Sequence, residues 1–133
     1  MSPVERVEVV KRGVAAETVV RIARLTGQPK ERVMSLLGLP RSTVDRKART
    51  AQALPLDQGE RVLGLLRLVG QVQVMVDESG DPEGFDAAKW VSSWLERPVP
   101  ALGNRPPAEF MDTSEGQQVV ANLLASARSG VFA

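Results

Sequence analysis

The sequence predicts an all-α protein, with a bundle of short N-terminal helices, then one long helix, then a small C-terminal helical domain. Apolar residues recur at spacings of three and four along almost every segment, which is the pattern of a helix with one buried face. No stretch alternates apolar and polar residues between hairpin turns, so no strand is expected. Glycine and proline separate the segments, where helices are expected to end and begin.

Four short helices are expected in the first half of the chain. Gly27 and Gly38 are expected to end helices, because glycine enters the left-handed conformation of a C-terminal cap at little cost. Pro29 and Pro40 suit the openings of the helices that follow, because a proline in the first turn forfeits no hydrogen bond. The expected helices cover residues 3–12, 15–26, 29–37 and 40–51. The second should turn Val19, Ile22, Ala23 and Leu25 inward.

A long helix over residues 57–76 is expected to open the second half. Asp57 followed three residues later by Glu60 is typical of a capping box at a helix start. The apolar stripe of this helix is wide, which indicates burial on more than one side.

The rest of the second half is predicted from its glycine and proline content and from its apolar period. The expected order is a loop over 77–84, a helix over 85–96, an extended connector over 97–107, and helices near 108–111 and 114–127. Trp90 and Trp94 stand one turn apart and are expected in the core, because exposed paired tryptophans are costly in water.

The composition argues against an enzyme. The chain has neither cysteine nor histidine, so it lacks thiol nucleophiles, the commonest general base and the commonest metal ligand. We therefore expect no catalytic residues, no cofactor and no metal. No apolar run approaches the roughly 18 residues that cross a bilayer, and no signal-peptide core is present, so a cytoplasmic protein without a membrane partner is expected.

The two halves of the chain carry opposite charge. Residues 1–56 hold 11 Lys and Arg against 5 Asp and Glu, whereas residues 57–133 hold 6 against 11. A basic half suits a polyanion, and an acidic half suits a protein partner or no partner in particular. We therefore expect two modules, 1–56 and 57–133, with different partners.

The two helices around Gly38 fit a helix-turn-helix unit, whose second helix enters the major groove of DNA. Leu37, Leu39 and Val44 stand where such a unit locks its helices together. With Val44 facing inward, polar residues point outward, where Arg can bind guanine or phosphate and Ser or Thr can bond base edges. The candidate DNA-binding residues are Arg41, Ser42, Thr43, Arg46, Lys47 and Arg49.

An ordinary solvated helix surface would show the same charged face, so both interpretations stay open here. Lys30 and Arg32 in the preceding helix favour DNA, because they add positive charge near the same end. Met34 and Lys47 count against it, because helix-turn-helix units usually place a small and an apolar residue at these positions.

Residues 94–133 carry a long and specific pattern. It consists of Trp94-Leu95, Pro98, Ala101-Leu102-Gly103, Arg105, Pro107, Phe110-Met111, Asp112-Thr113, Gly116, an amphipathic helix and Gly130-Val131-Phe132. This stretch resembles the toxin-binding domain of the Xre/MbcA/ParS family of antitoxins, and a looser likeness extends over nearly the whole chain. The chain departs from the family pattern at Asn104, where a second glycine is common, and at Pro106, where a helix-capping threonine is common.

The resemblance implies an antitoxin of a type II toxin-antitoxin system, partnered with a RES-domain toxin that uses NAD. It implies that the C-terminal region covers the active-site cleft of the toxin, and that the basic half binds operator DNA of its own operon. A homodimer within a larger toxin-antitoxin complex is expected, because a lone helix-turn-helix buries too little surface for tight specific binding to DNA. The implied toxin-binding residues are Asn104, Arg105, Arg128, Ser129, Gly130, Val131, Phe132 and Ala133.

Other interpretations remain open at this stage. The apolar tail would also suit a frayed end or a plug that closes the protein's own core. The whole chain would also suit a stand-alone helix-turn-helix repressor whose C-terminal half dimerises or senses a ligand. For a dimer interface, excess apolar surface is expected on the helix over 57–76 or on the first helix.

Overall fold

The computed structural model describes residues 2–80 and 82–128, and helices are the regular elements of this part of the chain. The all-α prediction is therefore confirmed. The α-helices are α1 (Pro3–Arg12), α2 (Thr18–Thr26), α3 (Lys30–Leu37), α4 (Arg41–Arg49), α5 (Leu56–Glu78), α6 (Ala87–Trp94) and α7 (Ser114–Arg128). Two short 3-10 helices, η1 (Pro100–Leu102) and η2 (Pro107–Phe110), lie between α6 and α7.

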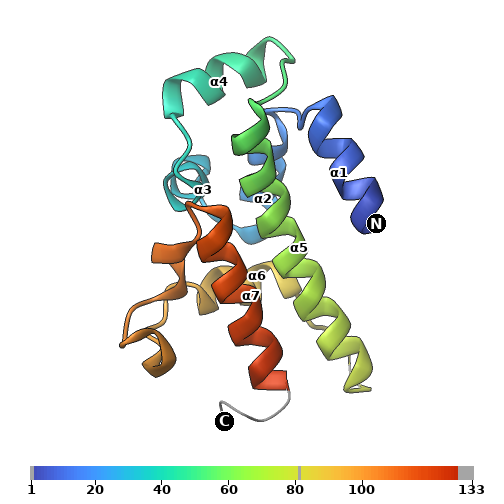
Figure 1. The fold of residues 1–133 in the computed structure, drawn as a ribbon, viewed down its shortest axis with the longest axis vertical. Coiled ribbons are helices and arrows are strands. Elements are labelled where there is room, and N and C mark those ends of the chain that lie inside the picture. Colours follow the sequence, from blue (N-terminus) through green and yellow to red (C-terminus); the bar gives the residue numbers. More distant parts are fainter. Residues whose placement is uncertain (1, 81, 129–133) are drawn as a thin grey trace.

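Helix α5 is the axis of the molecule, and α1, α3, α6 and α7 all pack on it (Figure 1). Its residues Val62, Leu65, Leu68 and Val72 are buried. The wide apolar stripe is thus covered from several sides, as its width predicted. Helix α4 stands at one end of the long axis of the molecule, and α7 ends near the other (Figure 1).

One hydrophobic core joins the two halves of the chain. Among its largest fully buried side chains, Ile22, Met34 and Leu37 come from the first half. Leu95 and Met111 come from the second half and belong to the same cluster. Met34 fills the position where helix-turn-helix units usually have a small residue, and its side chain is wholly buried.

The segment before α2 is tied to the segment before α5. Ala15 and Ala53 form an antiparallel bridge, in which Leu54 donates its backbone N–H to the Val14 carbonyl at 2.8 Å. Ala16 likewise donates to the Gln52 carbonyl at 3.0 Å. These bonds hold 15–17 outside the helix, so α2 begins three residues later than the sequence predicts.

Two local predictions were wrong. Asp57 does not cap α5, because the helix begins at Leu56 after Pro55 and has no side-chain cap; Asp57 pairs instead with Arg61, with Oδ2 and Nη1 3.5 Å apart. Leu25 does not face inward, and 56% of it is exposed. Both predictions used local patterns, which tertiary packing overrode.

The segment after α6 is more ordered than the extended connector that was expected. It contains η1, and Gly103 (φ 67°) and Asn104 (φ 63°) follow in the left-handed conformation. Trp90 and Trp94 stack with ring centroids 5.9 Å apart and pack against the core, although each ring is only partly buried. The tryptophans thus belong to the edge of the core.

Candidate functional site

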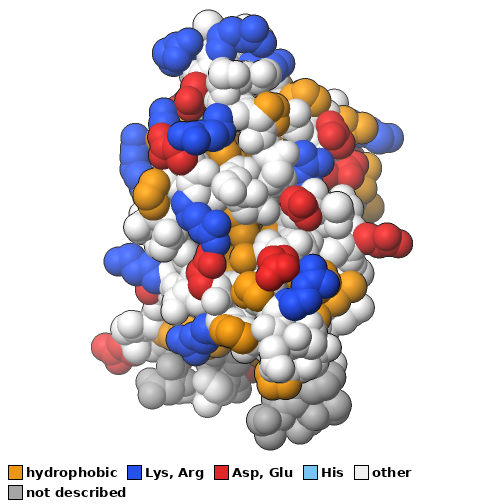
Figure 2. Space-filling model, turned by 90° about the vertical axis from the view of Figure 1, so that its left-hand side faces the viewer, with side chains coloured by type: hydrophobic (Ala, Val, Ile, Leu, Met, Phe, Trp, Pro, Cys, Tyr) orange, Lys and Arg blue, Asp and Glu red, His pale blue; other side chains and the backbone are white. Residues whose placement is uncertain are grey.

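Helix α4 presents a polar, basic face at one end of the molecule. Lys and Arg side chains gather at this end in the upper part of Figure 2. Val44 is 2% exposed and anchors the inner face of the helix. Of the six predicted DNA-binding residues, the structure places four in exposed positions: Arg41, Ser42, Arg46 and Arg49.

The other two predicted residues, Thr43 and Lys47, are partly buried. Lys47 directs Nζ toward the Ala53 carbonyl, at 3.5 Å, and so lies along the connection between α4 and α5. A long lysine side chain can cover apolar surface with its stem while its charge stays near water, which explains how Lys47 fits a position that usually holds an apolar residue.

The two basic residues of α3 have partners of their own. Lys30 pairs with Asp45 of α4 at 3.1 Å, and Arg32 pairs with Glu96 just after α6. Lys30 therefore stays at the α4 end, whereas Arg32 links α3 to the C-terminal region. The prediction that both residues extend the basic surface around α4 thus fits Lys30 better than Arg32.

Arg61 on α5, which the sequence interpretation missed, supports the turn between α3 and α4 through hydrogen bonds. Gly38 takes the left-handed conformation (φ 65°), as predicted for the turn, and leaves carbonyl groups of α3 without helical partners. Arg61 on α5 donates Nε to the Leu37 carbonyl at 2.7 Å and Nη2 to the Gly38 carbonyl at 3.3 Å. One sequence signal existed: an arginine inside a wide apolar stripe.

The same turn touches the C-terminal region. A Cβ built on Gly38 would lie 3.0 Å from Cβ of Asp112, which precedes α7. Gln117 of α7 is 5% exposed and donates Nε2 to the carbonyls of Arg61 (3.0 Å) and Met111 (2.9 Å). The residues that hold the helix-turn-helix are therefore in contact with the start of α7.

The loop between η1 and η2 presents two of the predicted toxin-binding residues, Asn104 and Arg105, in exposed positions. Val99 donates its N–H to the Arg105 carbonyl at 3.2 Å, which closes the loop. Arg105 Nε lies 3.2 Å from Glu109 Oε1, and its guanidinium carbon lies 4.8 Å from the Phe110 ring centroid. Arg105 is thus held by an ion pair and a cation–π contact.

The remaining predicted toxin-binding residues form the chain end. Helix α7 ends at Arg128, but the side chain of Arg128 and residues Ser129, Gly130, Val131, Phe132 and Ala133 lie outside the described residues. The loop and the end of α7 lie away from α4 (Figure 1), so the two candidate sites are separated along the molecule.

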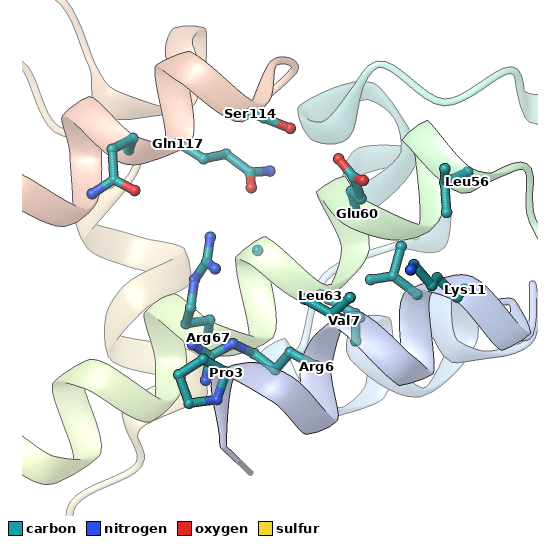
Figure 3. Close-up of a pocket in the computed structure, with 13 residues that line it drawn as sticks. Pro3, Arg6, Val7, Lys11, Leu56, Glu60, Leu63, Arg67, Ser114 and Gln117 are labelled. Atoms are coloured by element: carbon teal, nitrogen blue, oxygen red, sulfur yellow. The ribbon is translucent and has the colours of Figure 1, made fainter.

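A third surface feature lies between α1, α5 and α7. A hollow of about 460 Å³ is lined there by apolar residues such as Val7, Val10 and Leu63, with Glu60 and Arg67 at its rim (Figure 3). In the described parts of the chain, no group of acidic residues could hold a metal ion, and no helix has the length and apolar character of a membrane span.

Comparison with known proteins agrees with this geometry. Residues 5–67 match the antitoxin Xre-like helix-turn-helix domain, and residues 83–130 match the antitoxin Xre/MbcA/ParS C-terminal toxin-binding domain. A protein of Sphingobium sp. (strain YBL2) named Prs ADP-ribosylating antitoxin is 47% identical over 132 residues, which are 99% of this chain and 83% of that protein. The similarity therefore spans α4, α5 and the loop between η1 and η2.

Proposed function

Because the chain belongs to the Xre/MbcA/ParS family of antitoxins, we propose that it blocks the active-site cleft of a cognate RES-domain toxin and binds the operator of its own operon. The toxin is proposed to consume NAD. The name of the Sphingobium relative mentions ADP-ribosylation, a reaction in which NAD supplies the ADP-ribose group. ADP-ribosyl transfer is therefore the toxin chemistry that we favour over simple NAD hydrolysis or phosphorolysis.

The separation of two exposed surfaces on one shared hydrophobic core supports this double role. The basic end at α4 suits a polyanion, and the loop around Asn104 is distant from it. The loop is closed by backbone bonds and by the contacts of Arg105, so little conformational freedom is lost when a partner binds it. Arg105 keeps donors exposed that can meet acidic groups of the toxin.

Neutralisation is proposed to be steric, with residues 129–133 as the segment that enters the cleft. The test is coexpression of the antitoxin with its toxin, followed by a measurement of growth. Deletion of 129–133 is expected to abolish rescue of growth while operator binding is retained. Full rescue by the deleted chain would contradict the proposal. Arg105→Glu tests the loop in the same assay, and Arg97→Glu is its control, an exposed arginine outside the predicted contacts.

Operator binding is proposed to rest on the outward side chains of α4. Arg46→Ala combined with Arg49→Ala should weaken binding and flatten the log-log salt dependence by about 0.9 for each phosphate that the protein no longer neutralises. Arg21→Ala combined with Arg24→Ala is the matched control, because it removes two exposed arginines from α2. If both double variants keep the slope of the parent protein, α4 is an ordinary solvated surface.

The second candidate function is a stand-alone repressor whose C-terminal half dimerises or senses a ligand. The hollow between α1, α5 and α7 is the observation that favours it, since about 460 Å³ is enough for a small molecule. This candidate predicts that deletion of 129–133 leaves every activity intact. The growth assay therefore separates the two functions.

A further inference from the structure

The hollow between α1, α5 and α7 has the size of a small-molecule site. Its volume is about 460 Å³, and pockets for small ligands usually have roughly 300–1,000 Å³. Apolar side chains such as Val7, Val10 and Leu63 line it. Val7 and Leu56, which also lines it, are 53% and 55% exposed, so apolar surface stays open to water there. Covering this surface with an apolar group is therefore favourable.

The amide of Gln117 supplies a specific polar contact in the hollow. Its side chain is 5% exposed, and Nε2 donates to the carbonyls of Arg61 and Met111. Within residues 2–80 and 82–128, no hydrogen bond ends on Oε1 of this amide. Oε1 is not sealed from solvent, and Gln117 lines the hollow, so a ligand can reach this atom. Because nearly buried acceptors usually have a donor, Oε1 indicates a ligand with an N–H or O–H group.

The charged side chains of the hollow favour an anion. Arg6, Lys11 and Arg67 line it, whereas Glu60 is the one acid among the described residues that do so. Arg67 is exposed, and in the described parts of the chain it has neither a hydrogen bond nor an ion pair. A guanidinium can donate two parallel hydrogen bonds to a carboxylate, so Arg67 suits an acidic group of a ligand.

Gln117 and Arg67 lie close enough to serve one compact ligand. Oε1 of Gln117 occupies the space above Gly64, because a Cβ built on Gly64 would overlap it. Gly64 and Arg67 are three residues apart on α5, which is about 4.5 Å along the helix axis. Figure 3 shows Gln117 and Arg67 reaching toward the same hollow from α7 and α5. Glu60 is about two helical turns from Arg67, so the acid is well separated from this cation.

Other occupants use only part of these features. A neutral apolar molecule leaves the guanidinium of Arg67 without a partner, and an inorganic anion leaves the apolar wall in water. The backbone of a nucleic acid presents phosphates without an apolar group that could cover Val7 and Leu63. A small molecule that combines an anion, a donor and an apolar body uses all three.

We propose that the hollow binds a small organic acid. The acid has an apolar ring or chain that covers the walls on α1 and α5, a carboxylate that pairs with Arg67, and an N–H or O–H that donates to Oε1 of Gln117. Because Gln117 also bonds the Arg61 carbonyl, the ligand lies beside the residue that supports the turn before α4. This site is additional to those for toxin and operator, and binding to it is measured without either partner.

Three matched probes test the site on the full-length chain. Indoleacetate has an apolar ring, an N–H donor and a carboxylate. Benzofuranacetate has an oxygen in place of the N–H, and indoleacetamide has a neutral amide in place of the carboxylate. In amide NMR spectra of the isotope-labelled protein, indoleacetate should shift signals around Leu63, Gly64 and Gln117, with a dissociation constant of about 1 mM or lower. Each of the other two probes should bind at least about threefold more weakly.

Arg67→Gln tests the ion pair. It removes a charge from an exposed position, so the fold should stay unchanged. The variant should bind indoleacetate at least about threefold more weakly and should lose the preference for indoleacetate over indoleacetamide. Arg24→Gln is the matched control, because Arg24 is exposed on α2 and does not line the hollow. It should keep both the affinity and the preference of the parent protein.

The site is ruled out if no signal moves at ten times the expected dissociation constant, which is also the result when a second copy of the chain covers the hollow. Equal binding of the three probes, an unchanged preference in Arg67→Gln, or shifts confined to other parts of the chain would each overturn the proposal as well. Failure of the proposed function is a separate result, because the growth assay and the operator-binding measurements contain no probe.

Discussion

Gln117 of α7 lies directly over Gly64 of α5. A Cβ built on Gly64 would overlap Oε1 of Gln117, so the two helices approach this closely only because residue 64 has no side chain. The amide of Gln117 is buried there and donates to two backbone carbonyls, those of Arg61 and Met111. This contact joins α7 to the helix that supports the turn before α4.

Gly64→Ala is therefore expected to destabilise the protein. The new methyl group must displace Gln117, and overpacking of this kind lowers the free energy of unfolding by about 1–3 kcal/mol. Gly70→Ala is the control on the same helix, because a Cβ there meets nothing within 4 Å. It should raise the free energy of unfolding by about 0.5–1 kcal/mol, as expected for alanine in place of a helical glycine. Urea unfolding, with the oligomeric state of both variants checked, measures the difference.

Arg61 is expected to position the helix-turn-helix for DNA. Arg61→Ala removes the bonds to the Leu37 and Gly38 carbonyls, and loss of such charged hydrogen bonds should lower the free energy of unfolding by about 1.5–3 kcal/mol. Arg61→Lys keeps the charge but loses the two-pronged donor. It should weaken binding to the operator and leave binding to non-specific DNA unchanged. If operator binding by Arg61→Lys equals that of the parent protein, the role of Arg61 is structural only.

Within residues 2–80 and 82–128, two residues other than glycine have left-handed backbones, Ala51 (φ 55°) and Asn104 (φ 63°). Alanine has no side-chain group to offset the cost of this conformation, which is about 1–2 kcal/mol. After the extra chain entropy of glycine is subtracted, Ala51→Gly should raise the free energy of unfolding by about 1 kcal/mol. Asn104→Gly should change stability little, because asparagine tolerates this conformation, whereas Asn104→Val should destabilise. Thermal unfolding of the three variants checks this order.

The start of α1 is expected to depend on pH through Glu5. Hydrogen bonds from the backbone and the side chain of Ser2 lower the pKa of the Glu5 carboxyl below its ordinary value. A lowered folded-state pKa stabilises the helix above the ordinary glutamate pKa, and this contribution is lost as pH falls through the lowered value. The protection factors of amides in the first turn of α1, which are exchange rates corrected for the intrinsic pH dependence of exchange, should therefore fall in acid. Glu5→Gln, which cannot titrate, should show no such change at that turn.

The helix order could be predicted from the sequence because glycine and proline act locally. Gly27 and Gly38 both adopt the left-handed caps that were expected of them. The capping box predicted at Asp57 was wrong because α5 already begins at Leu56, so Asp57 lies inside the first turn of the helix and not at its N-cap. The prediction that Leu25 faces inward was wrong, because the helical period alone does not say which edge of an apolar stripe a neighbouring element covers.

The candidate sites were predictable to different degrees. The polar face of α4 followed from the helical period around Val44, which is buried as expected. The place of Arg61 in an apolar stripe was a signal in the sequence, but its partners were not predictable, because they lie 24 and 23 positions earlier in the chain. The structure shows why asparagine suits position 104, because the backbone there has a positive φ that asparagine tolerates better than most residues. Phe132 and its neighbours lie outside the described residues, so their proposed contact with a toxin stays a prediction.

The bonds of Arg61 to the turn have a practical meaning for hybrid antitoxins. A junction placed before α5 would join a new C-terminal half to a helix-turn-helix unit that has lost the guanidinium bonded to its turn. A junction after α5 would keep that guanidinium and Gly64, but it would replace Gln117, the residue that packs directly over Gly64. A hybrid with exchanged toxin specificity should therefore fold when residues 61, 64 and 117 all come from the same parent protein.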